Sequence, residues 1–151
     1  MTRSFEDQLA LEGYLIKQTK GVSMEPMLRQ YREESVICPV DREIRKYDVV
    51  LFRRKDGQYV LHRVVGMEGD IYLIRGDNCV GTERVLRQQI IGILKGFYRG
   101  ETYVDCTTDR AYLRYSHRIV RTFPLRRGKL RAKSLCKSLL KKLHIKSSGK
   151  G

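Results

Sequence analysis

Three short segments of the chain contain the residue types that hydrolysis of a peptide bond requires. A serine enzyme needs a hydroxyl nucleophile, a base that takes its proton, and N–H donors that stabilise the oxyanion. The segment GVSMEPML places Ser23 in a turn that contains Gly21 and Pro26. Such a turn holds a hydroxyl outside regular secondary structure and exposes neighbouring backbone N–H groups, although a serine in a turn is by itself an ordinary turn-forming residue.

A histidine and an acidic turn follow this serine along the chain. In the segment YVLHRVVG, strand alternation places His62 on the same face as Val60 and Val64. Imidazole is the side chain best suited to act as a base near neutral pH, but a single histidine on an apolar strand face is more often structural. The segment IRGDNC ends a strand in a turn that contains Asp77, and a Gly-Asp-Asn turn is by itself equally ordinary.

Taken together and in this order, the three segments resemble the superfamily of serine peptidases that includes the type I signal peptidases and the self-cleaving repressors. The family's G-x-S-M-x-P box matches residues 21–26, its strand pair matches YDVVLFR and YVLHRVVG, and its G-D-N box matches residues 76–78. The resemblance covers residues 20–96. It implies a β fold and a serine endopeptidase that cleaves a peptide or precursor protein through an acyl-enzyme, with no metal or other cofactor.

The resemblance also implies a role for each residue. In bacterial signal peptidases and in the repressors the base is a Lys followed by Arg, whereas the endoplasmic-reticulum and archaeal type has His followed by Arg, as this sequence has at His62 and Arg63. In this assignment Ser23 attacks the carbonyl carbon, His62 takes the proton of the hydroxyl, and Asp77 orients the imidazole. The backbone N–H groups expected to bind the oxyanion lie around the nucleophile, in the loop that contains Gly21, Val22 and Met24.

The pattern of apolar residues predicts a mainly β, antiparallel body. Runs rich in Val, Ile, Leu and Tyr indicate strands at residues 35–40, 47–53, 59–66, 71–75 and 90–98. The turn sequences Asp-Gly at 56–57 and Glu-Gly-Asp at 68–70 join such runs as hairpins. Residues 4–17 have apolar spacing nearer to the helical period and predict a short amphipathic helix. We therefore expect an antiparallel, signal-peptidase-like β domain at residues 1–109, with its core at 20–96.

The excess of positive charge is confined to the C-terminal part of the chain. The formal net charge is +14, and residues 110–151 contain 14 basic residues and no acidic one. Helical patterns at 110–121 and 129–146, interrupted by Pro124 and Gly128, predict a basic, helical tail. In the second pattern leucines gather on one face and lysines on another, as in helices that lie in a membrane interface.

This tail leaves two uses open and makes a third less favoured. Residues 129–146 are expected either to make a peripheral contact with an anionic membrane or to pack their leucines on the body. Nucleic acid is the less favoured ligand, because the tyrosines between the basic residues have no common stacking platform. The sequence does not predict an oligomeric state.

Several classes of protein are disfavoured by the rest of the composition. The chain contains no apolar run long enough for a transmembrane helix. Its first 14 residues include Glu6, Asp7 and Glu12 and lack the apolar block of a signal peptide. Four cysteines without a C-x-x-C spacing favour reduced thiols and argue against a zinc site. We therefore expect a cytoplasmic protein, with or without peripheral attachment to a membrane. It is either the serine endopeptidase or, alternatively, a non-catalytic β domain whose basic tail binds anionic lipid or nucleic acid.

Overall fold

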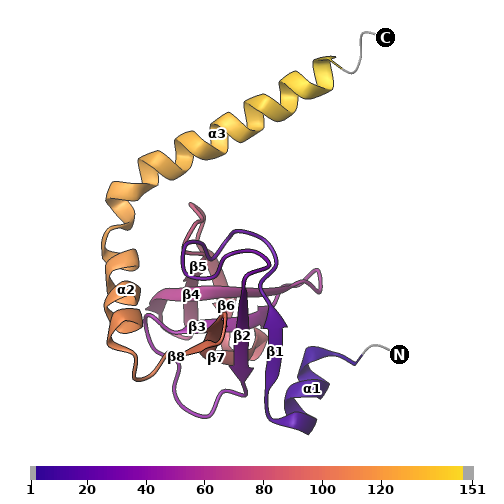
Figure 1. Cartoon of the computed structure of the whole chain (residues 1–151), viewed down its shortest axis with the longest axis vertical. Helices are drawn as coiled ribbons and strands as arrows, with labels where there is room; N and C mark the ends of the chain where they lie inside the picture. The colour runs from indigo at the N-terminus through magenta and orange to yellow at the C-terminus, as the bar shows by residue number, and fades with distance from the viewer. Residues whose placement is uncertain (1–2, 148–151) are drawn as a thin grey trace.

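An antiparallel sheet forms the body of the molecule, with one helix before it and two helices after it (Figure 1). The computed structural model describes residues 3–147. Within this range the sheet has eight strands: β1 (Leu15–Gln18), β2 (Glu33–Cys38), β3 (Val49–Arg53), β4 (Tyr59–Glu68), β5 (Ile71–Arg75), β6 (Glu83–Leu86), β7 (Ile90–Arg99) and β8 (Thr102–Asp105). The helices are α1 (Phe5–Glu12), a 3₁₀ turn (Arg87–Gln89), α2 (Arg110–Arg121) and α3 (Phe123–Ser147).

The strands follow the order β1-β2-β7-β3-β4-β5-β6, and β8 pairs with β7. Strand β3 lies in the middle of the sheet and is buried on both faces. Val49 and Leu51 pack into a first hydrophobic cluster on one face, and Val50 and Phe52 pack into a second hydrophobic cluster on the other. Register shifts between β2 and β7, β3 and β7, and β4 and β5 mark irregularities that bend a sheet. The curled sheet brings β1 and the start of β4 to the same groove.

The predicted mainly β, antiparallel fold with a short N-terminal helix and C-terminal helices is confirmed. Strands lie at all five predicted positions, and the two predicted hairpins join antiparallel neighbours, β3 with β4 and β4 with β5. The apolar pattern does not predict the four-residue strands β1, β6 and β8. Each of them buries at most one residue, so no alternation is visible in the sequence.

The helix predicted at residues 4–17 is too long. Helix α1 ends at Glu12, because Gly13 follows at φ 74°, a left-handed conformation that terminates helices. The N–H group of Gly13 donates to the carbonyl of Leu9 at 3.0 Å and closes the last turn. The chain then leaves the helix and forms β1, which pairs with β2.

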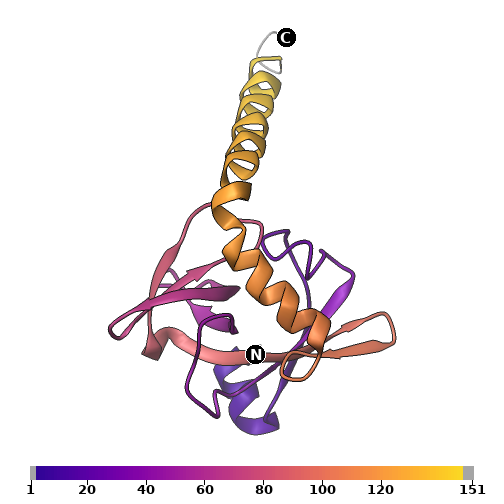
Figure 2. The ribbon, with the colours of Figure 1, turned by 90° about the vertical axis from the view of Figure 1, so that its left-hand side faces the viewer.

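Helix α2 lies against the body (Figure 2). It occupies the residues predicted for it, 110–121, and buries Tyr112, Ser116 and Ile119. Its charge groups it with the tail in the sequence, but its packing makes it part of the folded body. Its N-cap is Asp109, whose carboxylate accepts the N–H of Tyr112 at 2.7 Å.

Helix α3 continues after α2 and extends away from the body (Figures 1 and 2). The predicted break between two helices is present, but it lies at Thr122; the second helix begins at Phe123 rather than at Lys129, so Pro124 and Gly128 do not interrupt it. Pro124 lies in the first turn, where the N–H group that proline lacks has no partner in any helix, and a single glycine weakens a helix without breaking it. Among the described residues no helix is long and apolar enough to cross a membrane.

Candidate active site

A groove in the body contains the predicted nucleophile and the predicted base. Its volume is about 710 Å³. Ser23, His62 and Cys79 line it together, so the structure brings the predicted nucleophile and base to one site. Leucine, isoleucine and methionine side chains of the first hydrophobic cluster line much of the remainder, and β1 and the first residues of β4 border it.

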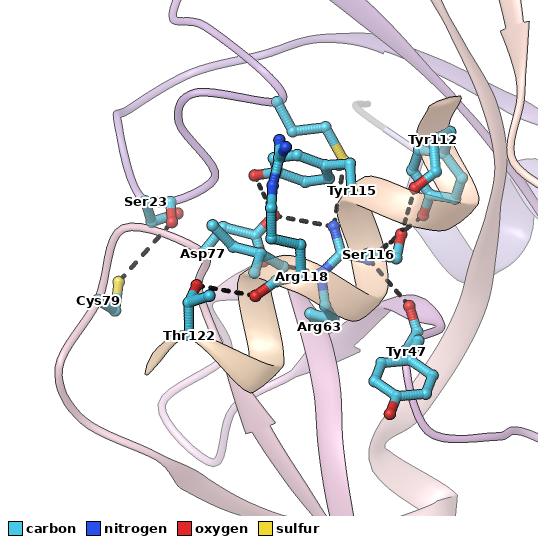
Figure 3. Close-up of polar contacts among 12 residues, drawn as sticks. Ser23, Tyr47, Arg63, Asp77, Cys79, Tyr112, Tyr115, Ser116, Arg118 and Thr122 are labelled. Carbon is cyan, nitrogen blue, oxygen red and sulfur yellow. Dashed lines mark hydrogen bonds and ion pairs between the residues drawn. The ribbon is translucent and has the colours of Figure 1, made fainter. Parts of the chain in front are cut away.

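Hydrogen bonds from the G-D-N turn hold the loop that carries the nucleophile. The backbone N–H of Asn78 donates to the Ser23 carbonyl at 2.8 Å, and its side-chain amide donates to the Val22 carbonyl at 3.0 Å. The Cys79 thiol points at the same Ser23 carbonyl, with sulfur and oxygen 3.9 Å apart (Figure 3). The nucleophile loop and the G-D-N turn, which lie far apart in the sequence, are therefore one structural unit.

Gly76 lies where this loop, the imidazole and the thiol meet. A Cβ atom at position 76 would lie 2.6 Å from the Ser23 carbonyl oxygen, 2.7 Å from Cys79 Sγ and 3.0 Å from His62 Nε2. Such close approach requires a residue without a side chain. The distances also show the direction of the imidazole, whose Nε2 faces Gly76 and the Ser23 loop.

His62 is almost completely buried in β4, with 6% of its surface exposed. Val60 and Val64, which alternation places on the same face, pack into the second hydrophobic cluster. Burial lowers the pKa of His62 because desolvation disfavours the imidazolium, and the Glu83 carboxylate opposes this effect without cancelling it. The imidazole is therefore mainly neutral at pH 7, as a general base must be.

The acidic residue that faces the other ring nitrogen is Glu83 of β6. Its Oε1 lies 3.5 Å from His62 Nδ1, within ion-pair distance of a protonated imidazole. Arg54 donates two hydrogen bonds of 2.6 and 2.7 Å to the same carboxylate and holds the pKa of Glu83 below its usual value. Sequence reasoning missed Glu83, and the signal that points to it is weak: it is the first acidic residue after Asp77.

Asp77 does not occupy the position predicted for it. Arg63 donates to both of its carboxylate oxygens, from Nε and Nη2 at 2.8 Å each, and both side chains are buried. Tyr115 of α2 donates to the same carboxylate at 3.0 Å. In the described part of the chain no hydrogen bond or ion pair joins Asp77 to His62. The assignment of Asp77 as the group that orients the imidazole is therefore corrected, because its carboxylate contacts Arg63 and Tyr115 and not His62.

Helix α2 closes over the Arg63–Asp77 ion pair (Figure 3). Arg63 also donates to Ser116 Oγ and to the Tyr47 carbonyl, each at 2.9 Å. Burial disfavours the guanidinium, but the hydrogen bonds and charge of Asp77 outweigh it and raise the pKa of Arg63. Burial, with the charge of Asp77, raises the pKa of Tyr115 and keeps its hydroxyl protonated as a donor. The turn that carries Asp77 is thus anchored by helix α2.

Two backbone N–H groups beside the nucleophile are available as donors. Within residues 3–147 the N–H groups of Ser23 and Met24 donate no hydrogen bond, whereas that of Glu25 donates to the Val22 carbonyl at 3.2 Å. Gly21 supplies the left-handed turn before them, at φ 78°. Of the loop residues predicted to surround the oxyanion, Met24 therefore offers a donor, Gly21 shapes the turn, and Val22 contributes a carbonyl acceptor.

Comparisons of the chain with protein-family models, with curated proteins and with solved structures gave no match. Among the described residues, no group of three or more His, Cys, Asp or Glu side chains is placed to hold a metal ion. The functional assignment therefore depends on the arrangement of the residues at the groove.

Proposed function

We propose that this protein is a serine endopeptidase with a signal-peptidase-like fold, in which Ser23 is the nucleophile and His62 is the general base. The observation that carries the proposal is the orientation of His62, whose Nε2 faces the Ser23 loop while its Nδ1 faces Glu83. In serine hydrolases the imidazole lies between the nucleophilic hydroxyl and a carboxylate, and here His62 lies between the loop that carries Ser23 and Glu83. The hydrogen bonds between the Ser23 loop and the G-D-N turn support the same assignment.

Catalysis proceeds through an acyl-enzyme. Ser23 Oγ attacks the carbonyl carbon of the scissile bond while His62 Nε2 takes the hydroxyl proton. Glu83 stabilises the imidazolium, and the N–H groups of Ser23 and Met24 stabilise the oxyanion. His62 then gives its proton to the leaving amine, the C–N bond breaks, and the acyl chain remains on the serine. Water deprotonated by the same imidazole hydrolyses the ester and restores the hydroxyl.

Two residues of the G-D-N turn act as positioning residues. Asn78 fixes the Ser23 loop through its two hydrogen bonds. Asp77 fixes the turn that carries Asn78, because it is held by Arg63 from β4 and by Tyr115 from α2. Both residues hold the nucleophile in place relative to His62. Glu83, in contrast, stabilises the protonated imidazole.

An extended peptide is the form of substrate that suits the groove. Within the described residues β1 pairs with β2 alone, and residues 59–62 of β4 pair with β3 but not with β5. Both segments border the groove and have one backbone edge without a paired strand. An extended peptide pairs with such an edge through main-chain hydrogen bonds, and its side chains alternate into and out of the groove.

The test is a comparison of newly formed protein N-termini in matched cells that express the wild-type chain, Ser23→Ala or Ser138→Ala at equal abundance. Ser138 is an exposed serine of α3 and provides the matched control. We expect new N-termini with the wild-type and Ser138→Ala proteins and none with Ser23→Ala. The residues before each cut would then define the preference of the groove.

New N-termini that are equally abundant with Ser23→Ala would contradict the proposal. So would their absence with all three proteins, provided that each is folded and that membranes are present. Either result would favour the non-catalytic β domain, whose tail would then be its main binding element.

A further inference from the structure

Helix α3 carries an exposed apolar stripe along most of its length. At 100° per residue, with Leu135 at zero, Leu125, Leu139 and Leu143 fall between about 40° and 80°. These four leucines are 58–83% exposed. The stripe from Leu125 to Leu143 is about 27 Å long at the rise of an α-helix. A row of leucines in water is unfavourable unless something covers it, which marks an interaction surface.

The stripe faces away from the body. Phe123, Arg126 and Leu130 are the half-buried side chains at the start of α3, and they lie between about 180° and 240° on the same scale. The guanidinium of Arg75 stacks on the Phe123 ring, with its Cζ 3.2 Å from the ring centre. Arg126 donates to the Asp77 carbonyl at 3.2 Å. The body therefore contacts the face opposite the leucines. Packing of the leucines on the body, one of the two uses that the sequence leaves open, is not observed.

Basic side chains border the stripe on both sides. Arg131 and Lys142 lie at about 320° and 340°, and Lys129 and Lys133 at about 120° and 160°. All four are exposed. Residues 110–151 contain no acidic side chain to neutralise them within the tail. The helix thus combines an uncovered apolar stripe with uncompensated positive flanks.

We propose that α3 lies in the surface of an anionic phospholipid membrane, with the leucine stripe at the acyl-chain boundary and the basic flanks against the headgroups. Helices that lie in the membrane interface combine these two features, and the flanking charges select anionic lipids. The membrane covers the leucines and supplies the negative charge that the tail lacks. This inference is independent of the proposed peptidase activity.

Two other occupants fit the helix less well. A second copy of α3 would cover the leucines but would place the basic flanks of one helix against those of the other, with no acidic residue to offset the repulsion. A nucleic acid would pair with the positive charges but would leave the leucines in water. Of these three occupants, the anionic membrane matches both features of the helix.

The test is cosedimentation of the full-length protein with vesicles of phosphatidylcholine alone and with vesicles of phosphatidylcholine mixed with phosphatidylglycerol. We expect the wild-type protein to bind the mixed vesicles at least about tenfold more tightly, and to be released at high salt. Replacing Leu135, Leu139 and Leu143 together with serine should weaken this binding by at least about tenfold. Leu11→Ser is the matched control, because Leu11 is equally exposed on α1, and it should bind as the wild type does.

A second variant separates apolar from electrostatic binding. Arg131→Gln, Lys133→Gln and Lys142→Gln together remove flanking charges on both sides of the stripe and should remove the preference for phosphatidylglycerol. Unchanged binding by the leucine variant, with binding lost in the charge variant, would overturn the proposal, since it would show attraction by charge alone. Self-association of the wild-type protein without vesicle binding would also overturn it and would assign the stripe to a second copy. Far-ultraviolet circular dichroism and urea unfolding confirm that each variant is folded.

Discussion

Replacement of Asp77 by asparagine distinguishes the two acidic residues at the site. Asp77→Asn keeps the size of the side chain but leaves Arg63, whose side chain is fully buried, without a counter-charge. The partners that remain to the guanidinium are neutral: the Tyr47 carbonyl and the hydroxyls of Ser116 and Tyr112. Loss of one member of a buried ion pair lowers the free energy of unfolding by about 3–5 kcal/mol.

Thermal and urea unfolding measured by circular dichroism test this expectation. A loss of about 3–5 kcal/mol lowers the midpoint of thermal unfolding by about 6–20 °C in a chain of this size. Glu83→Gln should leave the midpoint close to that of the wild type while it lowers activity, because Glu83 is partly exposed. Asp41→Asn removes an exposed ion pair with Lys95 and should leave both stability and activity unchanged.

The reasoning would be refuted by an Asp77→Asn variant that is as stable as the wild type and yet inactive. That result would leave the burial of the Arg63–Asp77 ion pair without energetic consequence. A Glu83→Gln variant with full activity would contradict the role of Glu83 directly.

The remaining predictions concern the imidazole and the G-D-N turn. Because burial lowers the pKa of His62 from its usual value of 6.5, kcat/KM should rise with pH through a midpoint below 6.5. Glu83→Gln should move this midpoint lower, because the carboxylate of Glu83 raises the pKa of His62. A pH–rate profile of each protein checks both expectations. Asn78→Ala removes the hydrogen bond to the Val22 carbonyl and should lower kcat at least about tenfold while costing at most about 1.5 kcal/mol of stability, measured by steady-state kinetics and urea unfolding. Gly76→Ala places a methyl group 3.0 Å from His62 Nε2 and should abolish activity, whereas Gly81→Ala, with open space around it, should not.

That Ser23 and His62 lie at one groove could be predicted from the sequence because the signals for both residues are local. Each segment is ordinary by itself, because Ser23 lies in a turn of Gly and Pro and His62 lies in an alternating strand. Their order along the chain, together with the G-D-N turn, resembles one family and singled out both residues. No three-dimensional knowledge was needed to place both at one groove.

The acidic partner could not be predicted because its position depends on strand pairing. Glu83 lies opposite Ile74 in the pairing of β5 with β6, and β6 has too few buried residues to be visible in the sequence. Asp77 was predicted from its place in the G-D-N box, but in the structure its carboxylate pairs with Arg63 and does not contact His62. Which carboxylate an arginine occupies is a property of the packed fold.

The tail shows the same limit in a different form. Helical periodicity identified the residues of α2, but the excess of positive charge concealed that Tyr112 and Ser116 are buried over the Arg63–Asp77 pair. The apolar stripe of α3 was visible as a pattern, whereas the face that it turns toward the body was not. Only the contacts of Phe123 and Arg126 settle that direction.

The central claim is that Ser23 and His62 act as one catalytic unit. The most direct test is the rate at which purified wild type, Ser23→Ala, His62→Gln and the double variant cleave a peptide taken from an observed cleavage site. Residues that act as a unit are strongly non-additive, so each single variant should lose about 10³-fold or more and the double variant no more than the worse single variant. Losses that multiply in the double variant, or cleavage that persists in Ser23→Ala, would contradict the account.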